Sequence, residues 1–445
     1  MDILIRDIAK YGGETVTIKG WVYNRRNSGK KLAFLQLRDG SGTIQGVAHV
    51  NEMPEEEFQS AAAVTTESSA IITGVVKEDK RAPSGFELTV TGFELVGEGS
   101  NDYPIQPKEH GVDFLLDRRH LWFRTERQRA ILRLRDRAIF YLRDFFNNDG
   151  FTCIDSPIIT GSACEGTSTL FELDYFGRPA YLSQSGQLYV EPACMALGSV
   201  YCFGPTFRAE KSFTRRHLTE FWMLEPEVAW QTQDGNIDLQ SRMIKSVVGR
   251  ILENDAELIE QIHFRQGEDS GEETAEEVIS RLEKARDEEF IRLTYDEALK
   301  ELERLGEPLT WGDDFGAPHE TKLTEEYGVP VFVEKWPAKI KAFYMQPDPD
   351  DDTYVQCDDL IASGGYGEII GGSIRIHDSD LLLERIDEHN LDRRAFQWYL
   401  DIREYGTVPH GGFGLGLERL VQWLGGVHHI RETIPFPRTI KRLEP

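Results

Sequence analysis

The sequence predicts an α+β protein with a small N-terminal β-barrel followed by a larger domain that mixes strands and helices. Two observations support this. The first hundred residues hold several short runs that alternate apolar and polar side chains, whereas the long stretch 124–150 has apolar residues at helical spacing. A chain of 445 residues also exceeds the usual size of one hydrophobic core. We therefore expect at least two domains.

The N-terminal barrel is predicted from strand-like runs at 15–50, 68–79 and 86–97. Turn signals separate them, at Asn27-Ser28-Gly29 and at residues 39–42. Several short strands in about a hundred residues fit a five-stranded barrel of the OB type. We assign this domain to residues 1–100.

The first hairpin of the barrel is basic and carries an aromatic ring. Interleaved cations and rings suit single-stranded nucleic acid, in which bases stack on rings and phosphates attract the cations. A solvated hairpin with Phe34 in the core is an equally good interpretation of this stretch alone. The residues concerned are Arg25, Arg26, Lys30, Lys31, Phe34, Arg38 and Gln45.

The second domain is expected over residues 121–445, after a linker at 101–120 rich in Gly, Pro and polar residues. It opens with the long amphipathic helix, which Gly150 ends, and a strand then runs into Pro157. Residues 253–289 hold 14 Asp or Glu against 4 Lys or Arg. We interpret the region of about 253–310 as a solvated, acidic helical insertion.

Charge and composition exclude several classes of protein. No apolar run reaches the length of a membrane helix, and the first residues lack the pattern of a secretory signal, so we expect a cytoplasmic protein without a membrane partner. The formal net charge of −26 argues against nonspecific nucleic-acid binding, but it allows a local basic groove. The five cysteines form no CxxC pair, so no zinc is expected.

Three segments carry groups suited to a nucleotide. "FRAEKSFTRRHLTEF" (207–221) concentrates cations, and "GFGLGLER" (412–419) spaces its glycines differently from G-x-G-x-x-G. Separated arginines can hold a polyphosphate without a P-loop. Asp359 and Glu368 supply oxygen ligands for Mg²⁺. Each segment alone fits a surface salt-bridge network, but the three segments together, beside a barrel suited to nucleic acid, are hard to explain as surface charges alone.

These stretches resemble the motifs of class II aminoacyl-tRNA synthetases of the aspartyl, asparaginyl and lysyl subgroup, over nearly the whole chain. The segment ending at Pro157 is similar to the first motif, and 207–221 and 412–419 are similar to the second and third. "GSACEGTSTLFELDYFGRPAYLSQSGQLYVEPAC", "FWMLEPEVAW" and "RETIPFPRT" look most like asparaginyl enzymes. The resemblance implies a homodimer whose catalytic domain is an antiparallel sheet flanked by helices.

The resemblance also implies roles for residues that match the motifs. It makes Arg208, Arg419 and Glu368 catalytic. The implied ATP-binding set is Arg208, Glu210, Arg216, His217, Glu220, Phe221, Glu368 and Arg419, and the Mg²⁺ ligands are Asp359 and Glu368. The barrel would read the anticodon of tRNA(Asn) through Arg25, Arg26, Phe34 and Gln45.

Asparagine is the expected amino acid substrate. Aspartyl enzymes have a lysine where this chain has Val190, whereas Glu191 and Arg375 would supply an acceptor and a donor for a side-chain amide. Glu165, Gln187 and Glu225 correspond to positions around the substrate's amino group. The expected reaction makes asparaginyl-adenylate from L-asparagine and ATP, and then charges tRNA(Asn).

Three alternatives stay open. "GGSIRIHD" (371–378) is closer to the aspartyl pattern and would fit an aspartyl-tRNA synthetase, including a non-discriminating one. A non-catalytic tRNA-binding paralogue is disfavoured because Arg208, Glu368 and Arg419 are all present. An asparagine-forming ligase is disfavoured because the barrel is retained.

Overall fold

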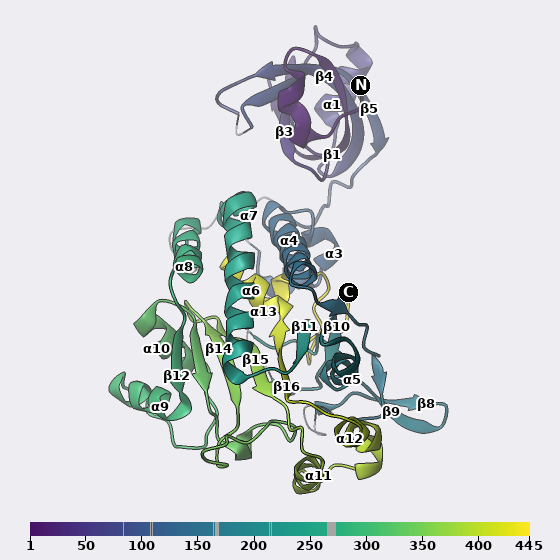
Figure 1. Ribbon diagram of the computed structural model, residues 1–445. Helices are drawn as coiled ribbons and strands as arrows, with labels where there is room; N and C mark the ends of the chain where they lie inside the picture. The colour runs from purple at the N-terminus through teal and green to yellow at the C-terminus, as the bar shows by residue number, and fades with distance from the viewer. Residues whose placement is uncertain are drawn as a thin grey trace. The chain divides into compact units, whose positions relative to one another are not determined.

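The chain forms two compact units, Met1–Val112 and Asp113–Pro445 (Figure 1). The structure is a computed structural model that describes residues 1–82, 84–106, 108, 110–162, 164, 169–212, 214, 216–264 and 273–445.

The first unit is a closed five-stranded barrel with strand order β1-β2-β3-β5-β4. Neighbouring strands are antiparallel except β3 and β5, which are parallel. Alternate residues of each strand point inward, as in β3, where Ile44, Gly46 and Ala48 are buried. The elements are η1 (Ile5–Tyr11), β1 (Thr15–Ser28), β2 (Leu32–Arg38), β3 (Thr43–His49), α1 (Glu55–Ala63), β4 (Ser68–Glu78) and β5 (Phe86–Gly97). The predicted OB-type barrel is confirmed.

The second unit is built on an eight-stranded sheet in the order β12-β13-β14-β15-β16-β11-β10-β6. Its central strands are antiparallel, as expected, whereas β12 with β13 and β6 with β10 are parallel. A small second sheet has the order β7-β9-β8. The strands are β6 (Thr152–Cys153), β7 (Ile159–Thr160), β8 (Glu172–Tyr175), β9 (Arg178–Leu182), β10 (Ser199–Phe207), β11 (Glu220–Ala229), β12 (Ile291–Thr294), β13 (Val331–Glu334), β14 (Cys357–Ala362), β15 (Gly367–Ile374) and β16 (His410–Gly416).

Helices surround this sheet (Figure 1). They are α2 (Val112–Leu116), α3 (Arg119–Trp122), α4 (Glu126–Asn148), α5 (Gln187–Leu197), α6 (Gln233–Asn254), α7 (Ala256–His263), α8 (Ala275–Asp287), α9 (Tyr295–Arg304), α10 (Ala317–Tyr327), α11 (Ser379–Glu388), α12 (Gln397–Glu404) and α13 (Leu417–Gly425). The main core lies between one face of the sheet and α4, α6, α7, α8 and α13, and it contains Leu224, Ile370, Phe413 and Leu415. The opposite face of the central strands carries the candidate site.

The acidic region 253–310 differs from the expected solvated insertion. Helices α7 and α8 bury Leu258, Ile262 and Leu282 in the main core, and β12 is the edge strand of the large sheet. The acidic residues of α7 and α8 are exposed, whereas the apolar faces of these helices cover the sheet. The expected linker at 101–120 also contains structure, since it holds α2 and the first residues of α3.

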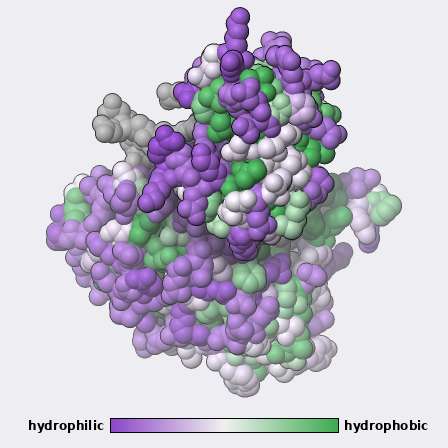
Figure 2. Space-filling model, turned by 90° about the horizontal axis from the view of Figure 1, so that it is seen from above, coloured by the Kyte–Doolittle hydropathy of each residue, from purple (hydrophilic) through white to green (hydrophobic). Residues whose placement is uncertain are grey.

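The surface view shows hydrophilic side chains over most of the visible face, with hydrophobic side chains in small groups (Figure 2). This agrees with the excess of acidic residues in the composition. Among the described residues, no helix is long and apolar enough to cross a bilayer.

Candidate functional site

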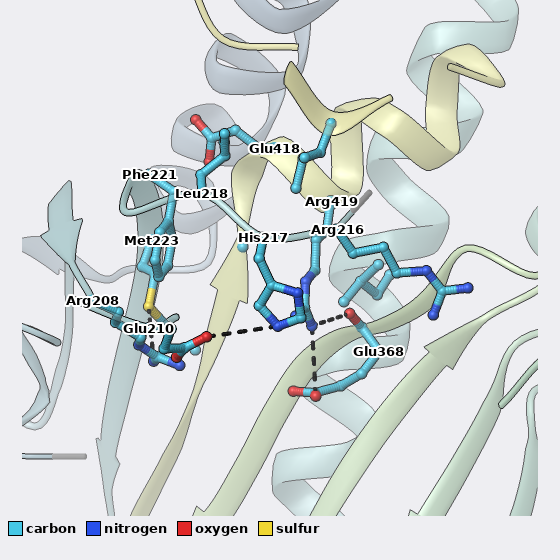
Figure 3. A pocket seen from close by; sticks show the side chains of 14 residues that line it. Arg208, Glu210, Arg216, His217, Leu218, Phe221, Met223, Glu368, Glu418 and Arg419 are labelled. Atoms are coloured by element: carbon cyan, nitrogen blue, oxygen red, sulfur yellow. Dashed lines mark hydrogen bonds and ion pairs between the residues drawn. The ribbon is translucent and has the colours of Figure 1, made fainter. Parts of the chain in front are cut away.

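A pocket on the open face of the large sheet gathers the second and third sequence motifs. Arg208 follows β10, Phe221 and Met223 lie on β11, Glu368 lies on β15 and Arg419 lies on α13 (Figure 3). Segments about two hundred residues apart in the chain thus share one cavity. Its lining residues are Arg208, Glu210, Arg216, His217, Leu218, Phe221, Met223, Glu368, Ile369, Gly414, Gly416, Glu418, Arg419 and Ile430.

The glycines of "GFGLG" form the floor of this face. Phe413 and Leu415 point into the main core, so strand alternation places the glycines between them on the open side. A Cβ at Gly414 would lie 2.3 Å from Cε of Met223, and a Cβ at Gly412 would lie 2.0 Å from the carbonyl oxygen of Pro226. The missing side chains are what allow close packing and leave room above the strand.

Cationic side chains enter the pocket from several directions (Figure 3). The guanidinium of Arg208 lies 5.4 Å from the centre of the Phe221 ring. Arg419 Nη1 donates a hydrogen bond to the backbone oxygen of Glu368 at 2.7 Å. Arg216 is anchored to Glu320 at 2.5 Å and also donates to the carbonyl of Gly365.

His217 lies beside these cationic side chains in the pocket. Its Nε2 lies 3.6 Å from the carboxylate of Glu210. Burial lowers the pKa of His217, and the neighbouring charge of Arg419 lowers it further. The imidazole is therefore mostly neutral at pH 7 in the absence of an anion, and a bound phosphate would favour its charged form.

Asp359 on β14 and Glu368 on β15 converge above Gly371. An ideal Cβ at Gly371 would lie 3.2 Å from Glu368 Oε1 and 3.5 Å from Asp359 Oδ1. Burial, together with the charge of Glu368, raises the pKa of Asp359 to about 7, although Lys341 at 2.6 Å opposes the rise. Two carboxylates that lie close together above a glycine suit a divalent cation.

A second group of charges lies deeper on the same face. Arg375 makes a two-point contact with Glu227, with Nη2 at 2.9 Å and Nε at 3.1 Å from its oxygens, and its Nη1 donates to Ser373 Oγ at 2.6 Å. Glu225 accepts from the backbone N–H of Gly186 at 2.8 Å and from the Ser185 hydroxyl. Both carboxylates project from β11 on the side of Phe221 and Met223, since these positions alternate along the strand.

Glu191 lies on α5 with its side chain fully buried. Its carboxylate accepts from Arg403 Nη2 at 2.6 Å, from the Tyr399 hydroxyl at 2.7 Å, and at 3.0 Å from both His410 Nε2 and Gln187 Nε2. Burial alone would raise its pKa, but Arg403 and His410 hold the pKa of Glu191 below its ordinary value. Four protein donors use this carboxylate, so the expected direct contact with a substrate amide does not fit.

Val190 is also buried, in an apolar cluster with Cys194, Val200 and Cys202. It therefore contributes no charge to the pocket. Among the described residues, Glu191, Glu227 and His410 bring three ligand-type atoms within 4.8 Å of one another. Arg375 and Arg403 already pair with the two carboxylates, so we assign no metal to this group.

On the barrel, the predicted anticodon residues have different surroundings. Phe34 is half-buried on the outer face of β2, and the Arg26 guanidinium lies 5.1 Å from its ring centre. Gln45 pairs across strands with Gln36, whose Nε2 donates to it at 3.0 Å. Arg25 instead donates to the carbonyl of Val64 at 2.9 Å and to that of Ala62, at the end of α1. Arg25 thus joins the hairpin to α1.

Comparison with known proteins identifies the family. The family described as tRNA synthetases class II (D, K and N) matches residues 111–440, and the OB-fold nucleic acid binding domain matches residues 16–96. This chain belongs to the class II tRNA synthetases. Members of this family are ATP-dependent ligases, and the pocket described above lies within the matched catalytic region.

Similar class II tRNA synthetases cover the whole chain. The asparagine–tRNA ligase of Desulforamulus reducens is 53% identical over 442 residues, which is 99% of each chain. The crystal structure of asparaginyl-tRNA synthetase from Pyrococcus horikoshii complexed with asparaginyl-adenylate is 42% identical with a TM-score of 0.93, and the match covers 100% of both chains. The aspartyl-tRNA synthetase from Entamoeba histolytica is 28% identical with a TM-score of 0.84, over 100% of this chain and 93% of that one.

Most site residues predicted for this class II synthetase come together, and some do not. Glu220 is absent from the pocket lining and pairs with Arg438 at the start of β11. Glu165 lies outside the described residues. The residues brought into the pocket are Arg208, Glu210, Arg216, His217, Phe221, Glu368 and Arg419.

Sequence reasoning missed three residues that lie beside predicted site residues of this class II synthetase. Glu227 is the partner of Arg375, and it would have been found by taking every second residue of β11 after Glu225. Lys341 contacts Asp359 from a short loop, and no pattern in the sequence marked it. On the barrel, Glu87 lies opposite Gln45 in the neighbouring strand β5.

Proposed function

We propose that this class II synthetase joins L-asparagine to tRNA(Asn), with ATP as the energy source. The strongest support is the single pocket in which Arg208, Phe221, Glu368 and Arg419 meet beside the Arg375–Glu227 pair. The full-length similarity to asparagine–tRNA ligases, at 53% identity, points the same way.

In the first step, the substrate carboxylate attacks the α-phosphate of ATP, forming a mixed anhydride and releasing pyrophosphate. Two anions must approach each other, so the protein contributes positioning and positive charge rather than a base or a covalent nucleophile. Arg208 lies beside the Phe221 ring, where it can contact the α-phosphate while adenine stacks on the ring. We assign His217 and Arg419, which line the same pocket, to the outer phosphates.

Asp359 and Glu368 would hold Mg²⁺, which supplies charge neutralisation on the phosphates when bound. Their convergence above Gly371 supports this assignment. In that state Lys341 would continue to neutralise Asp359 from the other side, since its ammonium group already lies 2.6 Å away.

The Arg375–Glu227 pair is proposed to recognise the asparagine side chain. Guanidinium N–H groups donate to an amide oxygen, and the Glu227 carboxylate accepts from an amide NH₂. Aspartate presents only acceptors, so its carboxylate would face Glu227 without a donor. Gln187 and Glu225, which lie nearby on α5 and β11, are proposed to hold the substrate's amino group.

In the second step, the adenylate transfers its asparaginyl group to a hydroxyl of the terminal ribose of tRNA, and AMP leaves. We propose that the barrel binds the anticodon through Arg26, Phe34 and Gln45, with Glu87 as a further acceptor for a base. Aromatic stacking and cations on one barrel face support this.

A homodimer in the cytoplasm completes the proposal. Strand β6 is the two-residue edge of the large sheet, and the nearby Ile158 and Ile159 are exposed at 45% and 46%. An unpaired sheet edge with exposed apolar side chains nearby in the chain is commonly covered by another chain. Light scattering on the purified protein would give twice the chain mass if a dimer forms.

The decisive experiment is pyrophosphate exchange into ATP without tRNA, with asparagine or aspartate supplied in parallel. We expect exchange with asparagine and little with aspartate. Exchange with aspartate alone would assign the chain to the aspartyl branch, and no exchange with either amino acid would contradict catalysis. Charging of tRNA(Asn) transcripts then tests the second step.

A further inference from the structure

Behind the Arg375–Glu227 pair lies a second, fully enclosed ion pair, Arg403 with Glu191. Both side chains have 0% exposure, and Arg403 Nη2 lies 2.6 Å from Glu191 Oε2. Arg403 also donates to the backbone oxygen of Ile376 at 2.9 Å, the residue that follows Arg375. The two ion pairs are thus joined through the backbone as well as through space.

The two carboxylates are close neighbours. Glu191, Glu227 and His410 each place one ligand-type atom within 4.8 Å of the others. His410 connects the layers, since its Nε2 lies 3.0 Å from Glu191 and its backbone oxygen accepts from the Arg375 N–H at 2.9 Å. Each carboxylate has its own arginine, so the four side chains carry balanced charge.

That balance matters because the two candidate amino acids differ by a single charge. In a buried site, a change of one unit charge at a neighbouring group is weakly screened. If Glu191 lost its charge, two guanidiniums would share only Glu227, and the excess positive charge would favour aspartate's carboxylate. Glu191 cannot act by contact, because four protein donors surround it.

We propose that Glu191 is a positioning residue that favours asparagine over aspartate without touching the substrate, by balancing the charge of Arg403 behind the Arg375–Glu227 pair. The inference rests on the proposed function and adds the source of its selectivity. It also gives a role to Tyr399, whose hydroxyl lies 2.7 and 2.8 Å from the two oxygens of Glu191 and holds the carboxylate in place.

The test compares three variants of the full chain by pyrophosphate exchange. In Glu191→Gln, which keeps shape and removes charge, the ratio of kcat/KM for asparagine to that for aspartate should fall about tenfold or more. In Glu191→Gln/Arg403→Gln, which removes both charges, the ratio should return to within about threefold of wild type. Tyr399→Phe removes a hydrogen bond without changing charge, so it should leave the ratio within about threefold.

The readouts separate a charge effect from general damage. KM for ATP should change little in all three variants, because the ATP pocket is lined by other residues. A ratio that falls no further in Glu191→Gln than in Tyr399→Phe, or that stays low in the double variant, would overturn the proposal. If Glu191→Gln does not fold, the double variant carries the test, and loss of its discrimination would overturn the proposal.

Wild-type protein decides the proposed function separately. Exchange of the wild type with asparagine upholds that function, and the variants then test Glu191 alone. A wild type that shows no exchange with asparagine would contradict the proposed function first, and the role of Glu191 with it.

Discussion

Arg135 on α4 lies 2.6 Å from Glu418 on α13, and both side chains are buried. Glu418 also accepts from the backbone N–H of Trp222 on β11 at 2.9 Å, and Arg135 donates to the carbonyl of Thr433 at 3.1 Å. Since Glu418 lines the pocket, this one ion pair joins the long helix α4, strand β11 and helix α13 at the proposed ATP site.

We expect Glu418→Gln to be strongly destabilising, because it leaves the Arg135 guanidinium buried without a counter-charge. The free energy of unfolding should fall by about 3–5 kcal/mol, and KM for ATP should rise. Urea unfolding of the full chain measures the first effect. The double variant Arg135→Met/Glu418→Leu is the matched control, since it leaves no unpaired buried charge and should be less destabilised than Glu418→Gln. If Glu418→Gln were as stable as wild type, the ion pair would not be needed for stability.

Arg208→Ala should reduce asparagine-dependent pyrophosphate exchange by about a thousandfold, because charge stabilisation at the α-phosphate is lost. Arg242→Ala on α6, an exposed arginine paired with Asp238 and Asp149, is the control and should exchange normally. Near-normal exchange by the Arg208 variant would refute its assignment to the α-phosphate.

The three glycines Gly204, Gly412 and Gly414 should respond differently to alanine. At Gly412 the new Cβ would meet backbone, 2.0 Å from the Pro226 oxygen, so the protein should lose stability. At Gly414 it would meet the flexible end of Met223 at 2.3 Å, so the fold should survive while the displaced side chain narrows the ATP pocket and raises KM for ATP. Gly204 has nothing within 4 Å of an added Cβ and serves as the control. Thermal melts and pyrophosphate exchange assays on all three alanine variants check this. A Gly414→Ala protein less stable than Gly412→Ala, or a KM for ATP unchanged in Gly414→Ala, would contradict the prediction.

The parts of the fold that could be predicted from the sequence are those set by local patterns. The alternation in 15–50 predicted barrel strands, and the helical spacing of 124–150 predicted α4. The prediction for the acidic region was wrong because the number of charged residues reflects only the exposed face of a helix. Leu258 and Leu282, on the buried faces, determine how these helices pack. Local apolar spacing carried more information there than composition.

The sequence predicted a site residue well where its side-chain type alone suggested its role. It predicted poorly where the role depends on contacts with residues far away in the chain. Arg208 and Arg419 meet in the pocket as their motifs indicated. Glu191 could not be interpreted correctly from its own segment, because Arg403, more than two hundred residues later, encloses it. Glu227 was overlooked although the strand pattern places it on the same face as Glu225.

Two adjacent arginines of the barrel should give opposite results. Arg26 is exposed beside Phe34, so Arg26→Ala and Phe34→Ala should both weaken tRNA charging at limiting tRNA. For Phe34→Ala the loss of tRNA binding free energy should be about 1–3 kcal/mol. Both variants should leave pyrophosphate exchange unchanged. Arg25→Ala should instead lower the melting temperature of the barrel, because Ala62 and Val64 lose their donor. If Arg25→Ala weakened charging without affecting stability, Arg25 would be a tRNA contact after all.

His217 should make ATP binding depend on pH. Burial, and next the charge of Arg419, lower the pKa of His217. The imidazole of the free protein is therefore mostly neutral at pH values above the ordinary histidine pKa. A bound phosphate group raises the pKa in the complex, which means that ATP binding takes up a proton at any pH between the two values. Affinity for ATP should therefore strengthen as pH falls from 8 toward 6, by at most about tenfold per pH unit, and then level off below the pKa of the free protein.

His217→Gln removes this titration while keeping a hydrogen-bonding side chain. Because ATP itself titrates in the same range, the informative quantity is the difference between wild type and variant, measured by calorimetry at several pH values in buffers of different ionisation enthalpy. We expect the wild type alone to show the additional proton uptake. Identical pH profiles for the two proteins would place His217 away from the phosphates and leave Arg419 as their contact.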